Sequence, residues 1–218
     1  MKPRVALIGL VPLGLWALAL AGCSLGQGEG EVKSDALVAP GCWYDSYDLK
    51  PDFFAAVPYR ETLQMRVQRG TDLQEVSDGL AVLVEDVDLV RRDLLGKPLK
   101  VTLSPGVLPP GSTFPPPPPE GQPAVHLALY LQKSCHNQNV ILYGVDGTIT
   151  FHSLFSGDPN EKEAAEKYSD AEFDVLMGDP REAPVGSSPN EIPDDRKSRV
   201  TGFYRFYFER GQPGQPFP

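Results

Sequence analysis

Alternating hydrophobic and polar residues in the second half of the chain are the feature that most limits its fold. Between residues 125 and 132 an aliphatic residue stands at every second position, and Tyr204, Phe206 and Phe208 share one face of the run 199–209. Successive side chains of a strand point to opposite faces, so this period of two predicts strands. Asp146-Gly147 separates two further runs, 140–145 and 148–155, which predicts a two-residue hairpin.

Patterns elsewhere in the chain predict more strands than helices. Shorter alternating or apolar runs occur at 62–69, 80–84, 100–104 and 173–177. Apolar residues at helical spacing after residue 87 predict one short helix, and Asp158-Pro159-Asn160-Glu161 predicts another over 159–168, because it has the form of a capping box. We therefore predict a mainly β fold, a single antiparallel β-sandwich of about eight strands with one or two short helices and long Pro-rich loops.

The longest predicted loop is rich in proline. Residues 105–123 include five consecutive prolines from 115 to 119. Proline has no N–H group to donate to a neighbouring strand, so this segment is expected to run over the surface as a semi-rigid loop.

The first 23 residues have the order of a lipoprotein leader. Lys2 and Arg4 precede a mostly apolar run of 17 residues, Val5–Ala21, and Leu20-Ala21-Gly22-Cys23 closes it. This arrangement resembles the signal peptide and lipobox of bacterial prolipoproteins. The resemblance implies that residues 1–22 are removed and that Cys23 carries fatty acyl groups of the palmitate type. The alternative, an uncleaved membrane span, has to use a run below the usual length of about 20 residues.

The same resemblance predicts the location of the mature protein. Lipidated Cys23 would anchor the chain to a membrane, and Ser24 stands where an inner-membrane retention signal would have Asp, which favours the outer membrane. Because Gly26, Gly28 and Gly30 lie in a polar stretch, residues 23–41 are predicted to be a flexible tether. Residues 42–218 are predicted to form the folded domain.

Cysteine content and charge fit an exported protein. Cys23 is one of three cysteines, so Cys42 and Cys135 remain as a pair in an oxidising compartment and are predicted to form a disulfide; two separate buried thiols are the alternative. Loss of Lys2 and Arg4 reduces the basic residues from 20 to 18, against 29 acidic ones. Such a surface repels phosphate backbones, so no nucleic-acid partner is expected.

Two groups of side chains are candidates for ligand binding. Aromatic residues are dense between 43 and 59, and Trp43, Tyr44 and Tyr47 could form a platform for a glycan or small ligand; packing of this segment onto the core is the alternative. His126, His136 and His152 stand on or beside three consecutive predicted strands and could converge on a metal in an envelope enzyme. Their spacing does not force convergence, so we predict no metal and no cofactor.

Two stretches resemble uncharacterised lipoproteins of the myxobacterial type, namely Ser134 to Asn139 and Arg205 to Pro213. This resemblance implies a membrane-anchored state and no particular activity. The sequence has no nucleophile-elbow, phosphate-loop or paired zinc-binding motif. We therefore expect a non-enzymatic structural or interaction module with a protein or glycan partner in the cell envelope.

Overall fold

The computed structural model describes residues 28–70, 77–107, 111–136, 138, 140–188 and 190–210. Within these ranges ten β-strands dominate, and helical structure is confined to short pieces. The predicted signal peptide 1–22, Cys23 and the end of the chain from residue 211 lie outside the described residues.

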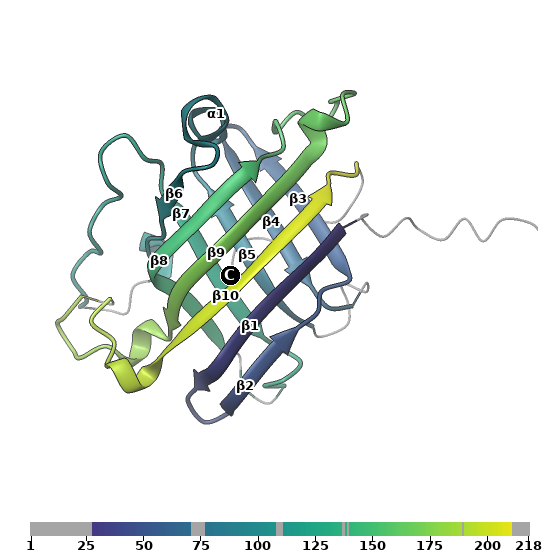
Figure 1. Ribbon diagram of the computed structural model, residues 1–218. Coiled ribbons are helices and arrows are strands. Elements are labelled where there is room, and N and C mark those ends of the chain that lie inside the picture. Colours follow the sequence, from purple (N-terminus) through teal and green to yellow (C-terminus); the bar gives the residue numbers. More distant parts are fainter. Residues whose placement is uncertain are drawn as a thin grey trace, which may run out of the picture.

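The strands form one continuous sheet, in which every pairing between named strands is antiparallel (Figure 1). Its order is β2-β1-β10-β9-β8-β7-β5-β4-β3, and β6 pairs with β8 beside this path. The strands are β1 Gly28–Ala39, β2 Trp43–Leu49, β3 Phe53–Tyr59, β4 Thr62–Gln68, β5 Asp78–Val84, β6 Pro98–Lys100, β7 Val125–Leu131, β8 Ile141–Ser153, β9 Tyr168–Gly178 and β10 Lys197–Tyr207.

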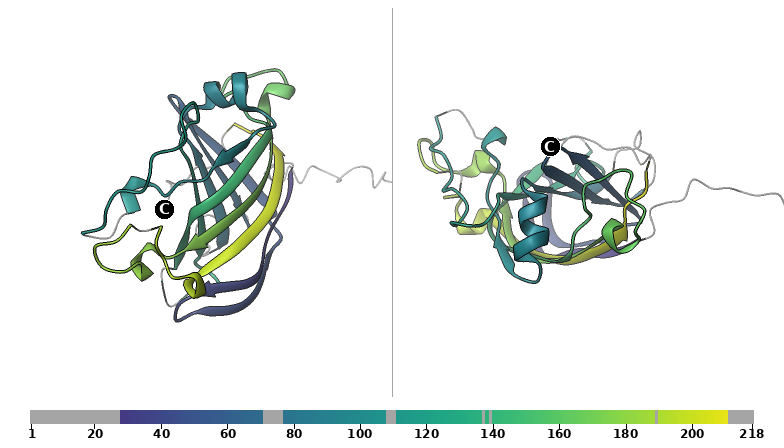
Figure 2. Two further views of the ribbon diagram at one scale, coloured as in Figure 1. Left: turned by 60° about the vertical axis from the view of Figure 1, so that its left-hand side comes forward. Right: turned by 90° about the horizontal axis from the view of Figure 1, so that it is seen from above.

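The sheet curls until its two halves face each other across one hydrophobic core (Figure 2). Phe54 of β3 stacks on Phe206 of β10 with ring centroids 5.7 Å apart, although these strands lie in opposite halves of the sheet. The Tyr204 hydroxyl likewise reaches across to the sulfur of Met65 on β4 at 3.5 Å. The mainly β, antiparallel prediction is therefore confirmed, with ten strands, and the two layers of the predicted sandwich are halves of one curled sheet.

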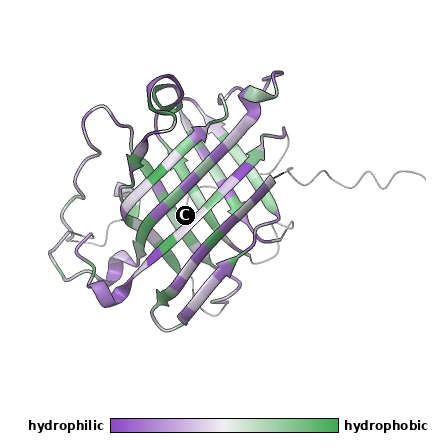
Figure 3. Ribbon diagram, in the orientation of Figure 1, coloured by the Kyte–Doolittle hydropathy of each residue, from purple (hydrophilic) through white to green (hydrophobic). Residues whose placement is uncertain are grey.

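Alternation of side chains is plain in the front half of the sheet, where hydrophobic and hydrophilic bands succeed one another along each strand (Figure 3). On β10, Val200, Tyr204 and Phe206 are buried in the core, whereas Arg199 and Arg205 point outward. The predicted face Tyr204, Phe206 and Phe208 is buried as expected.

The predicted tether is wrong from residue 28 onward. Gly28–Ala39 forms strand β1, which pairs with β10 on one side and β2 on the other. Val32, Leu37 and Ala39 supply the buried side chains that a solvated tether would lack. Hydrophobic burial at these three positions outweighs the polar composition of the segment.

The Asp146-Gly147 hairpin is also wrong, because both residues lie inside the long strand β8. The pairing of β8 with β9 shifts register between Gly144 and Asp146, which marks a β-bulge. Gly147 has a φ of +101°, and a Cβ added there would lie 2.3 Å from the Asp174 carbonyl oxygen. Asp-Gly therefore bends one strand here instead of joining two.

One of the two predicted helices forms. α1, Val87–Leu89, begins where the Asp86 side chain accepts a hydrogen bond from the Leu89 N–H, and it continues as a π-helical turn over Val90–Leu94. The predicted helix 159–168 is wrong: only Ala165–Lys167 is helical, as a 3₁₀ turn. The Glu161 carboxylate binds the N–H groups of Lys162 and Glu163, so it is not free to close a capping box. No helix among the described residues is long and apolar enough to cross a membrane.

Candidate binding surface on the outer sheet face

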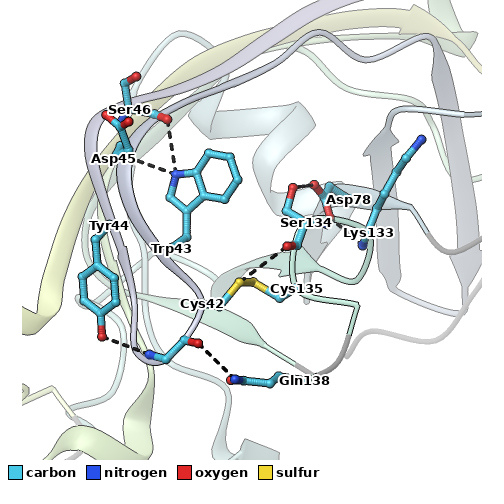
Figure 4. Close-up of a disulfide and its surroundings, with 11 residues drawn as sticks. Cys42, Trp43, Tyr44, Asp45, Ser46, Asp78, Lys133, Ser134, Cys135 and Gln138 are labelled. Atoms are coloured by element: carbon cyan, nitrogen blue, oxygen red, sulfur yellow. Dashed lines mark hydrogen bonds between the residues drawn. A yellow bond between two sulfur atoms is a disulfide. The ribbon is translucent and has the colours of Figure 1, made fainter.

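The predicted disulfide forms and joins distant parts of the sheet. Cys42 follows β1 and Cys135 follows β7, and their Cα atoms are 5.7 Å apart across a sequence separation of 93 (Figure 4). The turn that carries Cys135 is also held by Asp78, whose carboxylate accepts from the N–H groups of Lys133 and Ser134 at 2.9 and 3.0 Å. We call this region the disulfide end.

The three aromatic residues predicted as a platform do not share an exposed surface. Tyr47 is only 6% exposed and packs edge-on against Trp43, with ring centroids 5.9 Å apart. The Trp43 ring N–H donates to the carbonyl oxygens of Asp45 and Ser46, which ties it to its own strand. Tyr44 is 62% exposed and accepts from the Gly41 N–H (Figure 4). Trp43 and Tyr47 therefore pack against each other, and of the three rings only that of Tyr44 is largely exposed to solvent.

The histidines lie in three separate environments. His126 is buried, with Nδ1 donating to the Thr102 carbonyl at 2.7 Å and Nε2 3.3 Å from a Glu85 oxygen. His152 is exposed on β8, 3.6 Å from Glu172, and His136 lies in the turn after β7. Within the described ranges no group of three His, Cys, Asp or Glu side chains could hold a metal ion.

Shallow grooves lie on the outer face of the front half of the sheet. Two shallow grooves of about 410 and 450 Å³ lie next to each other there and share Thr201 of β10. The residues that line the first come from β8, β9 and β10; those that line the second come from β1 and β10. We call the two together the outer groove.

Strand register builds the outer groove from residues far apart in the chain. Asp174 of β9 is paired with Thr148 of β8 and with Thr201 of β10, and Thr201 is paired with Lys33 of β1. A second row beside it runs through Thr150, Glu172, Phe203 and Glu31. Paired residues point to the same face, so two parallel rows of hydroxyl, carboxylate, phenyl and ammonium groups cross four strands.

Charge divides the outer groove into two parts. Glu172 and Asp174 line the part over β8 and β9, whereas Lys33, Lys197 and Arg199 line the part toward β1 together with one acidic residue, Asp35. Lys33 pairs with Glu31 and Lys197 with Asp194, each at 2.7 Å. Arg199 Nε donates to Asp174 at 2.8 Å where the two parts meet. The Arg199 guanidinium holds the pKa of Asp174 below its ordinary value, so this carboxylate stays ionised. A general acid or base needs a pKa near the working pH, so this pair suits binding better than proton transfer.

A second polar cluster lies on the face of β4 and β7 that points away from the core. Arg66 Nε donates to the Tyr130 hydroxyl at 2.6 Å, and that hydroxyl donates to Gln68 at 3.1 Å. Gly79 lies beneath it, since a Cβ there would be 2.1 Å from the hydroxyl oxygen. The cluster is buried, and the alternation of β4 and β7 alone did not indicate it.

Buried tyrosines should make the protein sensitive to alkali. Burial raises the pKa of Tyr130 to about 12, and burial raises the pKa of Tyr47 and Tyr204 as well, with Asp78 adding to the effect on Tyr47. The folded state therefore keeps these protons after the unfolded chain, with a tyrosine pKa of about 10, has lost them. Stability from each should be complete below about pH 10 and fall by about 1.4 kcal/mol per pH unit above it, until the pH passes the folded pKa.

The check is absorbance at 295 nm recorded together with circular dichroism from pH 8 to 13. Ionisation of the three buried tyrosines should coincide with loss of β structure, and Tyr130→Phe should weaken the decline of stability with pH. Ionisation of all eight tyrosines in a protein that keeps its circular dichroism would contradict the prediction.

No protein-family model, no curated protein and no solved structure matches this chain.

Proposed function

We propose that the protein is a membrane-anchored, non-enzymatic envelope lipoprotein that binds a partner in the outer groove. The lipobox around Cys23 supports the anchor. The observation that carries the binding role is the pair of cross-strand rows, because they put polar and charged side chains of four strands next to one another on one exposed face with two adjoining grooves.

The chemistry of the outer groove favours a partner protein segment that bears both charges. Its acidic part, with Glu172 and Asp174, would take Lys or Arg side chains, and its basic part, with Lys33 and Lys197, would take carboxylates. The floor is a hydrogen-bonded sheet, so binding orders little of the protein itself. Complementary charge of this kind sets orientation and rate of association more than affinity.

A glycan is the second candidate partner, and the outer groove supports it better than the segment 43–59. Thr148, Thr150 and Thr201 offer hydroxyl groups, Glu172 and Asp174 accept hydrogen bonds from sugar hydroxyls, and Phe203 supplies a ring. Flat rings beside polar groups are well suited to amphipathic ligands.

The proposal is tested by recovering partners from the cell envelope with the lipidated protein as bait. Thr201→Arg places a long charged side chain where the two parts of the outer groove join, and should lower partner recovery about tenfold, equivalent to 1.4 kcal/mol. Protease-treated envelope and purified peptidoglycan, used as separate sources, distinguish a protein partner from a glycan. Cys23→Ala should move the protein out of the membrane fraction.

The matched control is Thr113→Arg, which makes the same substitution at an exposed threonine outside the outer groove. It should leave recovery unchanged. Equal recovery with Thr201→Arg would refute binding in the outer groove, and an acylated membrane form of Cys23→Ala would refute the anchor.

A further inference from the structure

The distance from the anchor to the sheet is short. Only residues 24–27 stand between Cys23 and Gly28, the first residue of β1. Five Cα-to-Cα steps span at most about 18 Å. Gly28 is fixed in the sheet by its pairing with Phe206, so a lipid on Cys23 would hold this part of the sheet within that distance of the membrane.

Gly28 lies toward the end of the sheet opposite the disulfide. β1 runs from Gly28 to Ala39, and eleven steps of a strand cover about 36 Å. Cys42 and the disulfide lie beyond its far end, at about twice the reach of the four linking residues. We call the near end the anchor end; it includes the β3–β4 turn, α1 and the segment 153–167 (Figures 1 and 2).

Backbone hydrogen bonds connect neighbouring elements of the anchor end. The Val87 N–H of α1 donates to the Glu61 carbonyl of the β3–β4 turn at 3.0 Å, and the Gly96 N–H donates to the Phe151 carbonyl at 2.8 Å. The Phe208 N–H binds the Lys167 carbonyl, also at 2.8 Å.

Among the described residues six large hydrophobic side chains are exposed; Tyr59, Leu95 and Tyr207 lie at this end, and Tyr44, Phe114 and Val185 lie elsewhere. Tyr59 is 65% exposed, Tyr207 42% and Leu95 39%. The Arg60 guanidinium lies 5.3 Å from the centre of the Tyr59 ring. A tyrosine ring with a polar tip, next to a cation, is suited to the boundary between lipid headgroups and acyl chains.

We propose that the anchor end rests on the lipid surface, with Tyr59, Leu95 and Tyr207 at the headgroup level, and that the disulfide end points away from the membrane. This orientation rests on the lipid anchor proposed above. It agrees with the short link between Cys23 and β1 and with the exposed rings at the anchor end, and it leaves the outer groove open from the side.

The mature chain provides its own probe. Trp43, beside the disulfide, is its only tryptophan, because Trp16 lies in the signal peptide. The lipidated protein is placed in phosphatidylethanolamine–phosphatidylglycerol vesicles whose acyl chains are brominated, which quenches nearby tryptophan. Native Trp43 should lose almost no fluorescence, whereas Tyr59→Trp in a Trp43→Phe background should lose roughly half, because its ring sits at the headgroup boundary.

Tyr207→Trp with Trp43 retained repeats the test without altering the packing around Trp43, and its additional fluorescence should be quenched to a similar extent. Flotation separates the two proposals. Native protein that does not float with the vesicles would refute the anchor and this orientation together. Protein that floats but shows quenching of Trp43, or none at positions 59 and 207, would refute the orientation alone.

Discussion

Replacing both Cys42 and Cys135 with Ala should lower the free energy of unfolding by about 4 to 5 kcal/mol in the chain-entropy model. The bond closes a loop across a sequence separation of 93 and joins β1, in the front half of the sheet, to β7, which pairs with β5 toward the other half. Its loss would return conformational freedom mainly to the unfolded chain. The folded sheet keeps its hydrogen bonds, so the variant should still fold, with a lower urea midpoint.

The measurement is urea unfolding of the chain from Ser24 onward, which keeps every described residue. Addition of dithiothreitol to the unsubstituted chain should reproduce the lower midpoint, and it should have no effect on the double variant. A decrease in the free energy of unfolding of less than about 1 kcal/mol in both experiments would mean that the bond contributes little beyond local contacts.

Strand identity could be predicted from the sequence wherever alternation was uninterrupted. β7 and β10 were predicted because every second side chain of each run is apolar. Those side chains face the core and are buried as predicted. β1 was missed for the opposite reason. Its buried positions are Val32 and Ser34, then Leu37 and Ala39, because a register shift between Ser34 and Leu37 changes the phase of the alternation. A bulge hides a strand from any argument based on a period of two.

Local turn chemistry proved ambiguous for a related reason. Asp146-Gly147 suits a tight turn and a bulge equally well, since both need a residue with positive φ. The Asp158 side chain accepts a hydrogen bond from the Asn160 N–H, as an N-cap residue would. The Glu161 carboxylate, however, accepts hydrogen bonds from the N–H groups of the next two residues. The residues of these two motifs do not by themselves determine which structure forms. For Asp146-Gly147, the pairing of β8 with β9 determines that it is a bulge and not a turn.

The candidate site could be predicted least well. Thr148, Asp174 and Thr201 lie on runs that were predicted as strands, but nothing in the sequence pairs Thr148 with Asp174 or Thr201 with Lys33. These pairings depend on register, and a slip of one residue would move every side chain to the other face. The disulfide was easier, because counting cysteines in an oxidising compartment needs no register.

Asp78→Ala should destabilise the protein by about 3 kcal/mol, although Asp78 lies far from the outer groove. Asp78 is buried, and its two oxygens accept from the N–H groups of Lys133 and Ser134 and from the Ser134 hydroxyl. Removal leaves three donors at a partly buried turn without their acceptor, and each unsatisfied donor costs about 1 kcal/mol or more. The turn also carries Cys135, so losses from Asp78→Ala and from the disulfide should be non-additive.

Asp48→Ala is the matched control, because this carboxylate is exposed on β2 and its contact with Lys50 is a surface ion pair at 3.5 Å. Its substitution should change stability by less than about 1 kcal/mol. Asp78→Ala should in addition lower the pKa of the buried Tyr47, because the Asp78 carboxylate helps to raise it; absorbance at 295 nm follows that change. Equal stability of the two variants would contradict the prediction and would show that water replaces the carboxylate at this turn.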